Sequence, residues 1–327
     1  MFVLQKACRT YLRQALLFLA FLIPCSSYAQ EPQTPAIRVE ISRVNVGVVA
    51  TDKNRNFVEG LKQTDFHVFD NGVERPLVGF LANDDPAQVI LMLECGPSVY
   101  LFGTANIQKA DALIARLAPQ DRVAIVCYSS SAEVQFELSD NKAEARLALR
   151  AINFYLGSAE LDLSRSLLAV FDWLQKVPGK KSVVLIGSGV DSAPPDDATA
   201  FQNRILASEV RVLAVSTSNL LTQLPKHHKR SIQQREALAR LAPILKAGEV
   251  SLRLFATSTG GRFYLPKSSK DFDKVYSEIA QIVRHEYNLA FVPQSFDGKL
   301  HTLSVTANYS ARLDHRQAYL APNSPGS

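Results

Sequence analysis

The sequence predicts an α/β fold with a doubly wound, mostly parallel sheet, flanked by β segments at both ends of the chain. Between residues 86 and 286, short runs of consecutive apolar residues alternate with stretches of helical periodicity. Residues 37–82 and 287–321 show strand patterns and turn signals instead. The chain has 327 residues, 47% of them hydrophobic, which is enough to build a sizeable core.

The first 29 residues have the pattern of a secretory signal peptide. Three basic residues and no acid precede an apolar run, Ala15 to Pro24, and small residues lead to an exit at Ala29. The run is short for a spanning helix, so we expect cleavage and no membrane-spanning segment afterwards; an uncleaved anchor is the alternative. Removing three positive charges lowers the net charge from +5 to +2, which gives no support for a nucleic-acid partner. We expect a secreted, periplasmic or cell-envelope location.

Residues 37–82 are predicted to form an N-terminal β segment. A stretch rich in β-branched residues is interrupted by a turn-forming run, Asp52 to Asn56. Farther along, two apolar runs, Phe66–Phe69 and Val78–Phe80, flank Asp70-Asn71-Gly72. This triplet is a strong signal for a hairpin turn.

Residues 86–286 are predicted to form the α/β domain. Continuous apolar runs indicate buried strands, apolar–polar alternation indicates a strand with one exposed face, and apolar residues at helical spacing indicate helices. Buried strands are expected at 89–93, 123–126, 183–186 and 210–215, the alternating strand at 134–138, and helices over 107–117, 163–174 and 272–283. Ser268 and Asp271 have capping-box spacing at the start of the last helix, and Asp196-Asp197 indicates an exposed turn into another.

The C-terminal β segment, residues 287–321, contains three candidate strands. They are expected at 287–292, 300–308 and 317–320, with a turn at Asp297-Gly298 between the first two. Residues 322–327 are predicted to be a disordered tail. The two β segments either form one small β-sandwich with the α/β domain inserted between them, or pack separately.

Ligands of parallel sheets bind at the carboxyl ends of the strands. The loops after Glu94, Tyr128 and Gly187 are therefore expected to meet at one edge of the sheet, together with the loop after Gly157. We call this edge the rim.

Segments spread over nearly the whole chain after residue 29 share a family resemblance. They are Val48 to Lys53, Gly60-Leu61, Asp65-Phe66, Asp70-Asn71-Gly72, Pro119 to Ala124, Gly179 to Leu185, Thr259 to Phe263, and the series from Tyr287 to His301. In order and spacing they resemble a bacterial family of exported proteins with a von Willebrand factor A-related domain. The resemblance implies a von Willebrand factor A-type fold and, on its rim, a metal-ion-dependent adhesion site.

The adhesion-site motif of the family is degraded in this chain. The resemblance implies an Asp-x-Ser-x-Ser loop after the first strand, a Thr from a second loop and an Asp from a third, which together give a divalent cation its oxygens. Here Glu94 stands at the first Asp, Gly96 at the first Ser, Ala159 at the Thr and Ser188 at the second Asp, and only Ser98 matches.

Too few oxygen ligands remain at the degraded site for a divalent cation. Glu94, Ser98 and Ser188 carry one formal charge among them, so we expect no bound metal and no cofactor. The alternative is Mg²⁺ bound by these three side chains, or by others that a slipped register would bring in, namely Ser158, Glu160 or Asp191.

Cys95 and Cys127 follow neighbouring strands and should lie near the same part of the rim. An exported chain meets an oxidising compartment, so the two thiols can pair. The alternative is one buried thiol and one partly exposed thiol.

The expected function is a non-catalytic protein-interaction or adhesion module that binds an unknown protein ligand. The rim loops contain no histidine that could act as the base for a nucleophile. The spacing of the other histidines is not that of metal ligands; they are His67, His285, His301 and His315. A structural role in the cell envelope is the first alternative, and a hydrolytic enzyme is the second. The residues expected to form the binding rim are Glu94, Cys95, Ser98, Ser158, Ser188 and Asp191.

Overall fold

The computed structural model describes residues 43–96, 109–152, 160–222, 232–268 and 270–323. All of them belong to one compact unit, Ile41–Ser327. The predicted signal peptide lies outside the described residues, as do Ser98 and Ser158 of the predicted rim.

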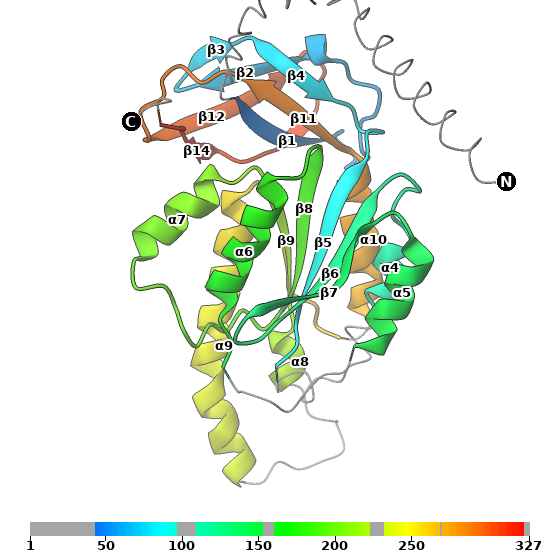
Figure 1. Cartoon of the computed structure of the whole chain (residues 1–327), viewed down its shortest axis with the longest axis vertical. Coiled ribbons are helices and arrows are strands. Elements are labelled where there is room, and N and C mark those ends of the chain that lie inside the picture. Colours follow the sequence, from blue (N-terminus) through cyan, green and yellow to red (C-terminus); the bar gives the residue numbers. More distant parts are fainter. Residues whose placement is uncertain (1–42, 97–108, 153–159, 223–231, 269, 324–327) are drawn as a thin grey trace, which may run out of the picture. The chain divides into compact units, whose positions relative to one another are not determined.

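The middle of the chain forms a six-stranded sheet with the order β10-β9-β8-β5-β6-β7 (Figure 1). The strands are β5 (Ala87–Glu94), β6 (Arg122–Tyr128), β7 (Ala132–Ser139), β8 (Lys180–Gly187), β9 (Arg211–Ser216) and β10 (Phe263–Tyr264). Neighbouring strands are parallel except for β7, which runs antiparallel to β6 at one edge. On β7, Phe136 and Leu138 are half-buried, as the alternating apolar pattern predicts, but Val134, which the pattern places with them, is 47% exposed at the edge of the sheet.

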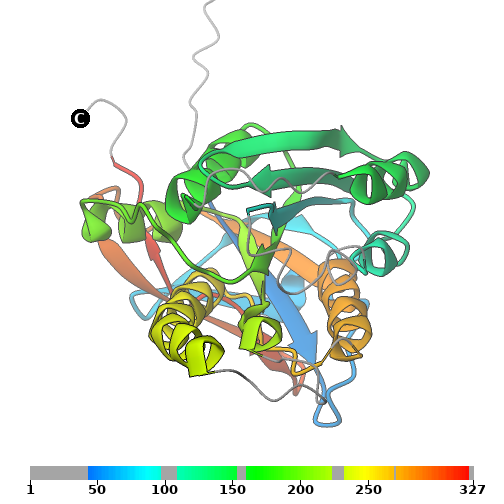
Figure 2. The same cartoon turned by 90° about the horizontal axis from the view of Figure 1, so that it is seen from below.

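Helices cover both faces of this sheet (Figures 1 and 2). They are α4 (Asp111–Ile114), α5 (Lys142–Ala151), α6 (Leu163–Gln175), α7 (Ala198–Ala207), α8 (Ser218–Thr222), α9 (Ile232–Ser258) and α10 (Asp271–Arg284). Successive residues of the central strand β5 serve opposite faces. Leu91 packs in a core with α4, α5 and α10, whereas its neighbours Ile90 and Met92 pack in a second core with α6, α7 and α9. The prediction of a doubly wound, mostly parallel sheet is confirmed.

The two β segments interleave in a pair of four-stranded sheets. One has the order β13-β1-β11-β4 and the other β14-β12-β2-β3. The strands are β1 (Val44–Thr51), β2 (Phe66–Asp70), β3 (Val73–Arg75), β4 (Leu77–Leu81), β11 (Glu286–Phe291), β12 (Leu300–Ala307), β13 (Arg312–Asp314) and β14 (Ala318–Leu320). Val46, Tyr287 and Leu303 share one core with residues of both sheets. The segments therefore form a single β-sandwich, into which the α/β domain is inserted between β4 and β11.

Local signals in the sequence explain several element ends. Asn71 and Gly72 both have positive φ, 49° and 81°, as a two-residue hairpin turn between β2 and β3 requires. Asp197 caps α7 by accepting a hydrogen bond from Ala200 N at 2.8 Å. At α10 the N-cap is Lys270 rather than Ser268, although Asp271 still accepts a hydrogen bond from the Ser268 N–H.

Two regions go beyond the elements expected from the sequence. The 27-residue helix α9 contains Pro243 and has only a weak apolar periodicity. The periodicity is weak because only the second half of the helix packs one face against the sheet. At the C-terminus, Asn323 forms a bridge with Asp297, so ordered backbone continues past residue 322; residues 324–327 lie outside the described part.

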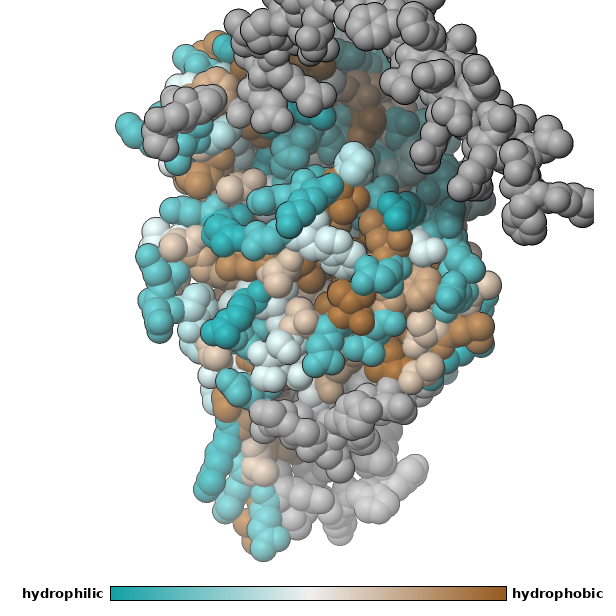
Figure 3. Space-filling view, viewed as in Figure 1, coloured by the Kyte–Doolittle hydropathy of each residue, from teal (hydrophilic) through white to brown (hydrophobic). Residues whose placement is uncertain are grey.

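None of the helices that the structure describes combines the length and the apolar character needed to cross a membrane. On the face shown in Figure 3, hydrophobic residues are scattered among hydrophilic ones. Large exposed apolar side chains such as Val78, Leu147 and Leu300 come from different elements, and isolated residues of this kind are ordinary on protein surfaces.

Candidate functional site

Glu94 stands at the end of β5, where the rim begins, and is completely buried. Its Oε2 accepts hydrogen bonds from Ser188 N and Ser188 Oγ, both at 2.6 Å, and from Tyr128 Oη at 3.3 Å. Ser188 follows β8 and Tyr128 ends β6, the two strands on either side of β5. The first and third loops of the predicted adhesion site are therefore joined directly by side chains.

Gly187 makes the room that the Glu94 carboxylate occupies. A Cβ at this position would lie 2.3 Å from Tyr128 Oη and 2.8 Å from Glu94 Oε2, far inside normal contact distances. Burial, followed by the Glu94 charge, raises the pKa of Tyr128 well above its usual value, so its hydroxyl remains a donor. The three groups form a buried network around a single carboxylate oxygen.

Hydrogen bonds between the loops hold the rest of the rim together. Asp162 N donates to Ser129 O at 2.7 Å, and Ser192 N donates to Leu161 O at 2.8 Å. The Ser192 hydroxyl also accepts from Leu161 N at 2.6 Å. These hydrogen bonds link the loop at Ser129, the loop at Leu161 and Asp162, and the loop at Ser192.

Asp191, a predicted rim residue, is also committed to an internal contact. Its Oδ2 accepts hydrogen bonds from Ser164 N at 3.0 Å and Ser164 Oγ at 2.5 Å, and its Oδ1 accepts from Ala193 N at 3.2 Å. Asp162 caps α6 through Arg165 N. Both carboxylates therefore accept hydrogen bonds from the first turn of α6 or from the loop beside it.

A disulfide joins Cys95 and Cys127 across the ends of β5 and β6. Their Cα atoms are 5.5 Å apart, and Cys95 N donates a hydrogen bond to Tyr128 O at 2.9 Å. This Cα separation is usual for such a bond. The disulfide lies directly beside the Glu94 network and fixes the first loop of the rim at its origin.

The described residues do not fit the metal site of the family. A serine at position 96 would need space that Leu161 occupies, because a Cβ on Gly96 would lie 2.8 Å from Leu161 Cδ2. The Glu94 carboxylate already receives the Ser188 donors, and Ser98, Ser158 and Ala159 lie outside the described residues. Across the parts of the chain that the structure describes, no group of three or more His, Cys, Asp or Glu side chains could hold a metal ion.

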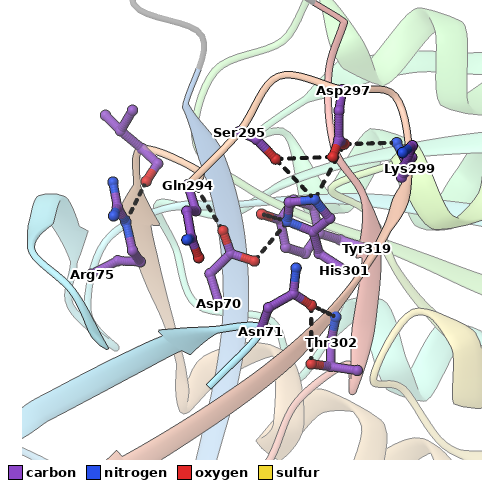
Figure 4. Close-up of polar contacts among 11 residues, drawn as sticks. Asp70, Asn71, Arg75, Gln294, Ser295, Asp297, Lys299, His301, Thr302 and Tyr319 are labelled. Carbon is purple, nitrogen blue, oxygen red and sulfur yellow. Dashed lines mark hydrogen bonds and ion pairs between the residues drawn. The ribbon is translucent and has the colours of Figure 1, made fainter. Parts of the chain in front are cut away.

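A second polar cluster lies in the β-sandwich and joins strands that are distant in the sequence (Figure 4). His301 Nδ1 lies 2.7 Å from Asp70 Oδ1, while its Nε2 lies 3.2 Å from Asp297 Oδ1 and 3.4 Å from Ser295 Oγ. Tyr319 Oη lies 3.2 Å from His301 Nδ1. Asp70 is fully buried and His301 is 2% exposed. The cluster ties β2, β12 and β14 to the loop after β11.

Ser295, His301 and Asp70 are the residue types of a serine-hydrolase triad, but their arrangement is not that of a proton relay. Both ring nitrogens of His301 face carboxylate oxygens, which can only accept hydrogen bonds. The Ser295 hydroxyl donates to Asp297 Oδ2 at 3.0 Å. The hydrogen bond from Lys299 N, followed by those from Ser295 and His301, holds the pKa of Asp297 below its usual value. The cluster therefore acts as a structural clamp.

The sequence held one signal for this clamp. The residues of β12 are alternately exposed and buried, which puts His301 on the same buried face as Leu303 and Val305. A buried histidine needs hydrogen-bond partners, so the pattern alone predicts a polar contact in the core. It could not identify Asp70, which is 231 residues away.

Comparisons with known proteins show likeness to several solved structures. No protein-family model and no curated protein matches the chain. A von Willebrand factor type A structure from Catenulispora acidiphila is 12% identical, with 80% of this chain and 74% of that chain covered and a TM-score of 0.45. An aerotolerance-related membrane protein from Bacteroides fragilis is 13% identical, with 60% and 98% covered and a TM-score of 0.42.

A third similar structure is proximal thread matrix protein 1 from the mussel byssus. It is 13% identical, with 62% of this chain and 49% of that chain covered and a TM-score of 0.45. Independently of these structures, the sheet has β5 at its centre, parallel neighbours on both sides and the antiparallel β7 at one edge. The α/β part of the chain has a von Willebrand factor A-like fold.

Proposed function

We propose that this chain is an exported protein-interaction module that binds a protein partner through its rim without a metal ion. The observation that carries the proposal is the buried Glu94 network. In a metal-dependent site, the first carboxylate helps to hold a cation whose open position accepts a carboxylate of the partner. Here Ser188 and Tyr128 hold that carboxylate instead, so the rim keeps its shape without a cation.

The partner would be recognised by shape and hydrogen bonds. Ser130 and Ser131 are exposed on the rim, beside the loops that backbone hydrogen bonds and the disulfide hold in place. A rigid surface loses little conformational entropy on binding, which favours affinity even where few charged groups are available.

The rim can be tested with a surface substitution that leaves the network intact. Ser130→Arg places a large side chain on the exposed turn between β6 and β7, and Ser310→Arg is the matched control on an exposed turn of the β-sandwich. Immobilised wild type should retain one partner from envelope extract, with or without EDTA. Ser130→Arg should lose that partner, and Ser310→Arg should retain it.

Three outcomes of this experiment would overturn the proposal. Loss of the partner in EDTA, with recovery in Mg²⁺, would show a metal-dependent rim. Equal retention by Ser130→Arg and wild type would place the contact elsewhere. If no partner is retained from any envelope fraction, the structural role in the envelope replaces the interaction role.

Export is a separate part of the proposal and has its own test. The chain should be recovered outside the cytoplasm with a new N-terminus at Gln30, directly after the predicted cleavage site at Ala29. N-terminal sequencing of the recovered chain reads this directly. An intact Met1 in the membrane fraction would instead show an uncleaved anchor.

A further inference from the structure

A trough runs between the β-sandwich and the α/β domain, at the opposite end of the parallel sheet from the rim. It consists of two adjoining cavities of about 840 Å³ and 490 Å³. Both are lined by Arg43, Gln175, Lys181 and Glu209, so they meet at these residues. Each volume is in the range of cavities that bind ligands.

The floor of the trough is the outer face of the sheet β13-β1-β11-β4. Asn45, Ala290 and Gly79 lie side by side in register on β1, β11 and β4, while the opposite face of the sheet belongs to the sandwich core. These residues are small or polar. The Arg43 guanidinium lies over Gly79: a Cβ there would be 3.8 Å from Arg43 Nη1, an ordinary contact distance.

The trough contains a buried acceptor that lacks a donor. Gln88 is only 7% exposed, and its Oε1 has no hydrogen-bond partner within the described structure. An unpartnered buried amide oxygen is uncommon because it loses its hydration without compensation. Gln88 is paired in register with Lys181 on the adjacent strand, and both residues line the larger cavity.

The same place holds two cations that have no bonded carboxylate among the described residues. Neither Lys181 nor Arg43 makes a hydrogen bond or an ion pair with any described residue. Glu209 lies nearby, but both of its oxygens accept hydrogen bonds from Asn45, at 2.9 and 2.6 Å. Burial lowers the pKa of Lys181, Glu209 opposes that change and Arg43 adds to it. Lys181 therefore lies where a further negative charge would be favourable.

We propose that the trough binds an extended, acidic segment of a partner protein, with a carboxylate of the segment at Lys181 and Arg43, beside the buried amide of Gln88. The two cavities adjoin at the cations, so a chain passing along both would bring a side chain to this point. The charges of Lys181 and Arg43 select an acid. The site goes beyond the proposed rim contact and does not depend on it, since Gln88 lies near the start of β5 and Glu94 at its end.

The probe for this site is a fluorescein-labelled hexapeptide of alternating glutamate and glycine, and the analogue with glutamine in place of glutamate is the neutral control. Fluorescence anisotropy with the purified chain should show binding of the acidic peptide, and binding of the neutral one at least about tenfold weaker. Lys181→Met should weaken binding of the acidic peptide by about tenfold or more and leave binding of the neutral peptide unchanged. Lys299→Met, an exposed lysine on the β11–β12 loop, should match wild type.

NMR of the labelled lysine side chains gives a second readout. The acidic peptide should raise the pKa of Lys181 while that of Lys299 stays constant. If Lys181→Met alters the thermal unfolding of the chain, Arg43→Met provides a second test, because Arg43 is at an exposed position. Arg43→Met should also weaken binding of the acidic peptide. Equal binding of the two peptides, no binding up to about 1 mM, or unchanged affinity in both variants would overturn the proposal.

Discussion

The two ends of the parallel sheet differ in how their polar groups are used. At the rim, Glu94 and Asp191 are engaged by neighbouring donors, and a disulfide closes the first loop. At the trough, within the part of the chain that the structure describes, Gln88 has an unpartnered oxygen and Lys181 lacks a bonded carboxylate. The carboxyl ends of the strands are where ligands of such folds usually bind. Among the described residues, the polar groups at that end are bonded to one another, whereas the other end holds polar groups without such partners.

This difference has a consequence for stability. Polar groups that are satisfied internally stabilise the fold, so removing them leaves buried partners unsatisfied. Polar groups that await a ligand contribute little to folding. Substitutions at the rim should therefore cost much more unfolding free energy than substitutions at the trough.

The largest effect is expected for Glu94→Ala. The substitution leaves the Ser188 and Tyr128 donors without their acceptor in a buried cavity, and should lower the free energy of unfolding by about 3–4 kcal/mol. Urea denaturation measures this directly. Glu137→Ala, an exposed glutamate on β7, is the matched control and should stay within about 0.5 kcal/mol of wild type. A loss below about 1 kcal/mol for Glu94→Ala would show that the network contributes little.

Loss of the disulfide should have the next largest effect. Cys95 and Cys127 are 32 residues apart in the sequence, and opening a loop of this size should cost about 3 kcal/mol. The double substitution Cys95→Ala/Cys127→Ala, compared with wild type by urea denaturation, gives the value. Reductant should destabilise wild type and leave the double variant unchanged. An equal response of both proteins to reductant would mean that the bond does not stabilise the rim.

Gly187→Ala should cost about 2 kcal/mol, because the added methyl group must displace Tyr128 or Glu94. The nearest obstacle is the Tyr128 hydroxyl, so Tyr128→Phe should relieve part of the cost. A double-mutant cycle is expected to give a coupling of about 1 kcal/mol between the two positions. Simple additivity would contradict the tight packing described around the carboxylate.

The smallest effect on stability is expected for Lys181→Met, within about 0.5 kcal/mol of wild type at neutral pH. Because burial lowers the pKa of Lys181 in the folded chain, the unfolded chain binds more protons between the folded value and the ordinary one, 10.5. Wild-type stability should therefore rise with pH through this window, and that rise should be absent from the variant. Denaturation at several pH values tests the sign. A loss of stability comparable with that of Glu94→Ala would remove the distinction between the two ends.

Much of the fold could be predicted from local patterns. The apolar runs that became β5, β6 and β8 and the helical spacing that became α6 and α10 depend only on neighbouring residues. The turn at Asn71-Gly72 likewise follows from conformations that these two residues adopt readily. The helix α9 was less evident because its first half lacks an apolar stripe facing the sheet.

The candidate sites were harder to predict because they depend on contacts between distant residues. Glu94 and Gly96 could be compared with the adhesion-site motif that the resemblance implies, but no local pattern predicts that Tyr128 and Ser188 donate hydrogen bonds to the Glu94 carboxylate. The trough combines Arg43, Gln88 and Lys181 from three strands, and each is an ordinary polar residue in its own segment. Its unpartnered oxygen becomes visible only when all neighbours are placed.

Whether the rim keeps its form without a metal ion can be measured by isothermal titration calorimetry of the purified chain with Mg²⁺, Mn²⁺ and Ca²⁺. Because Glu94 is already bonded to Ser188, we expect no binding tighter than about 1 mM for any of the three ions. A dissociation constant below about 1 μM in wild type that is lost in Glu94→Ala would contradict the claim.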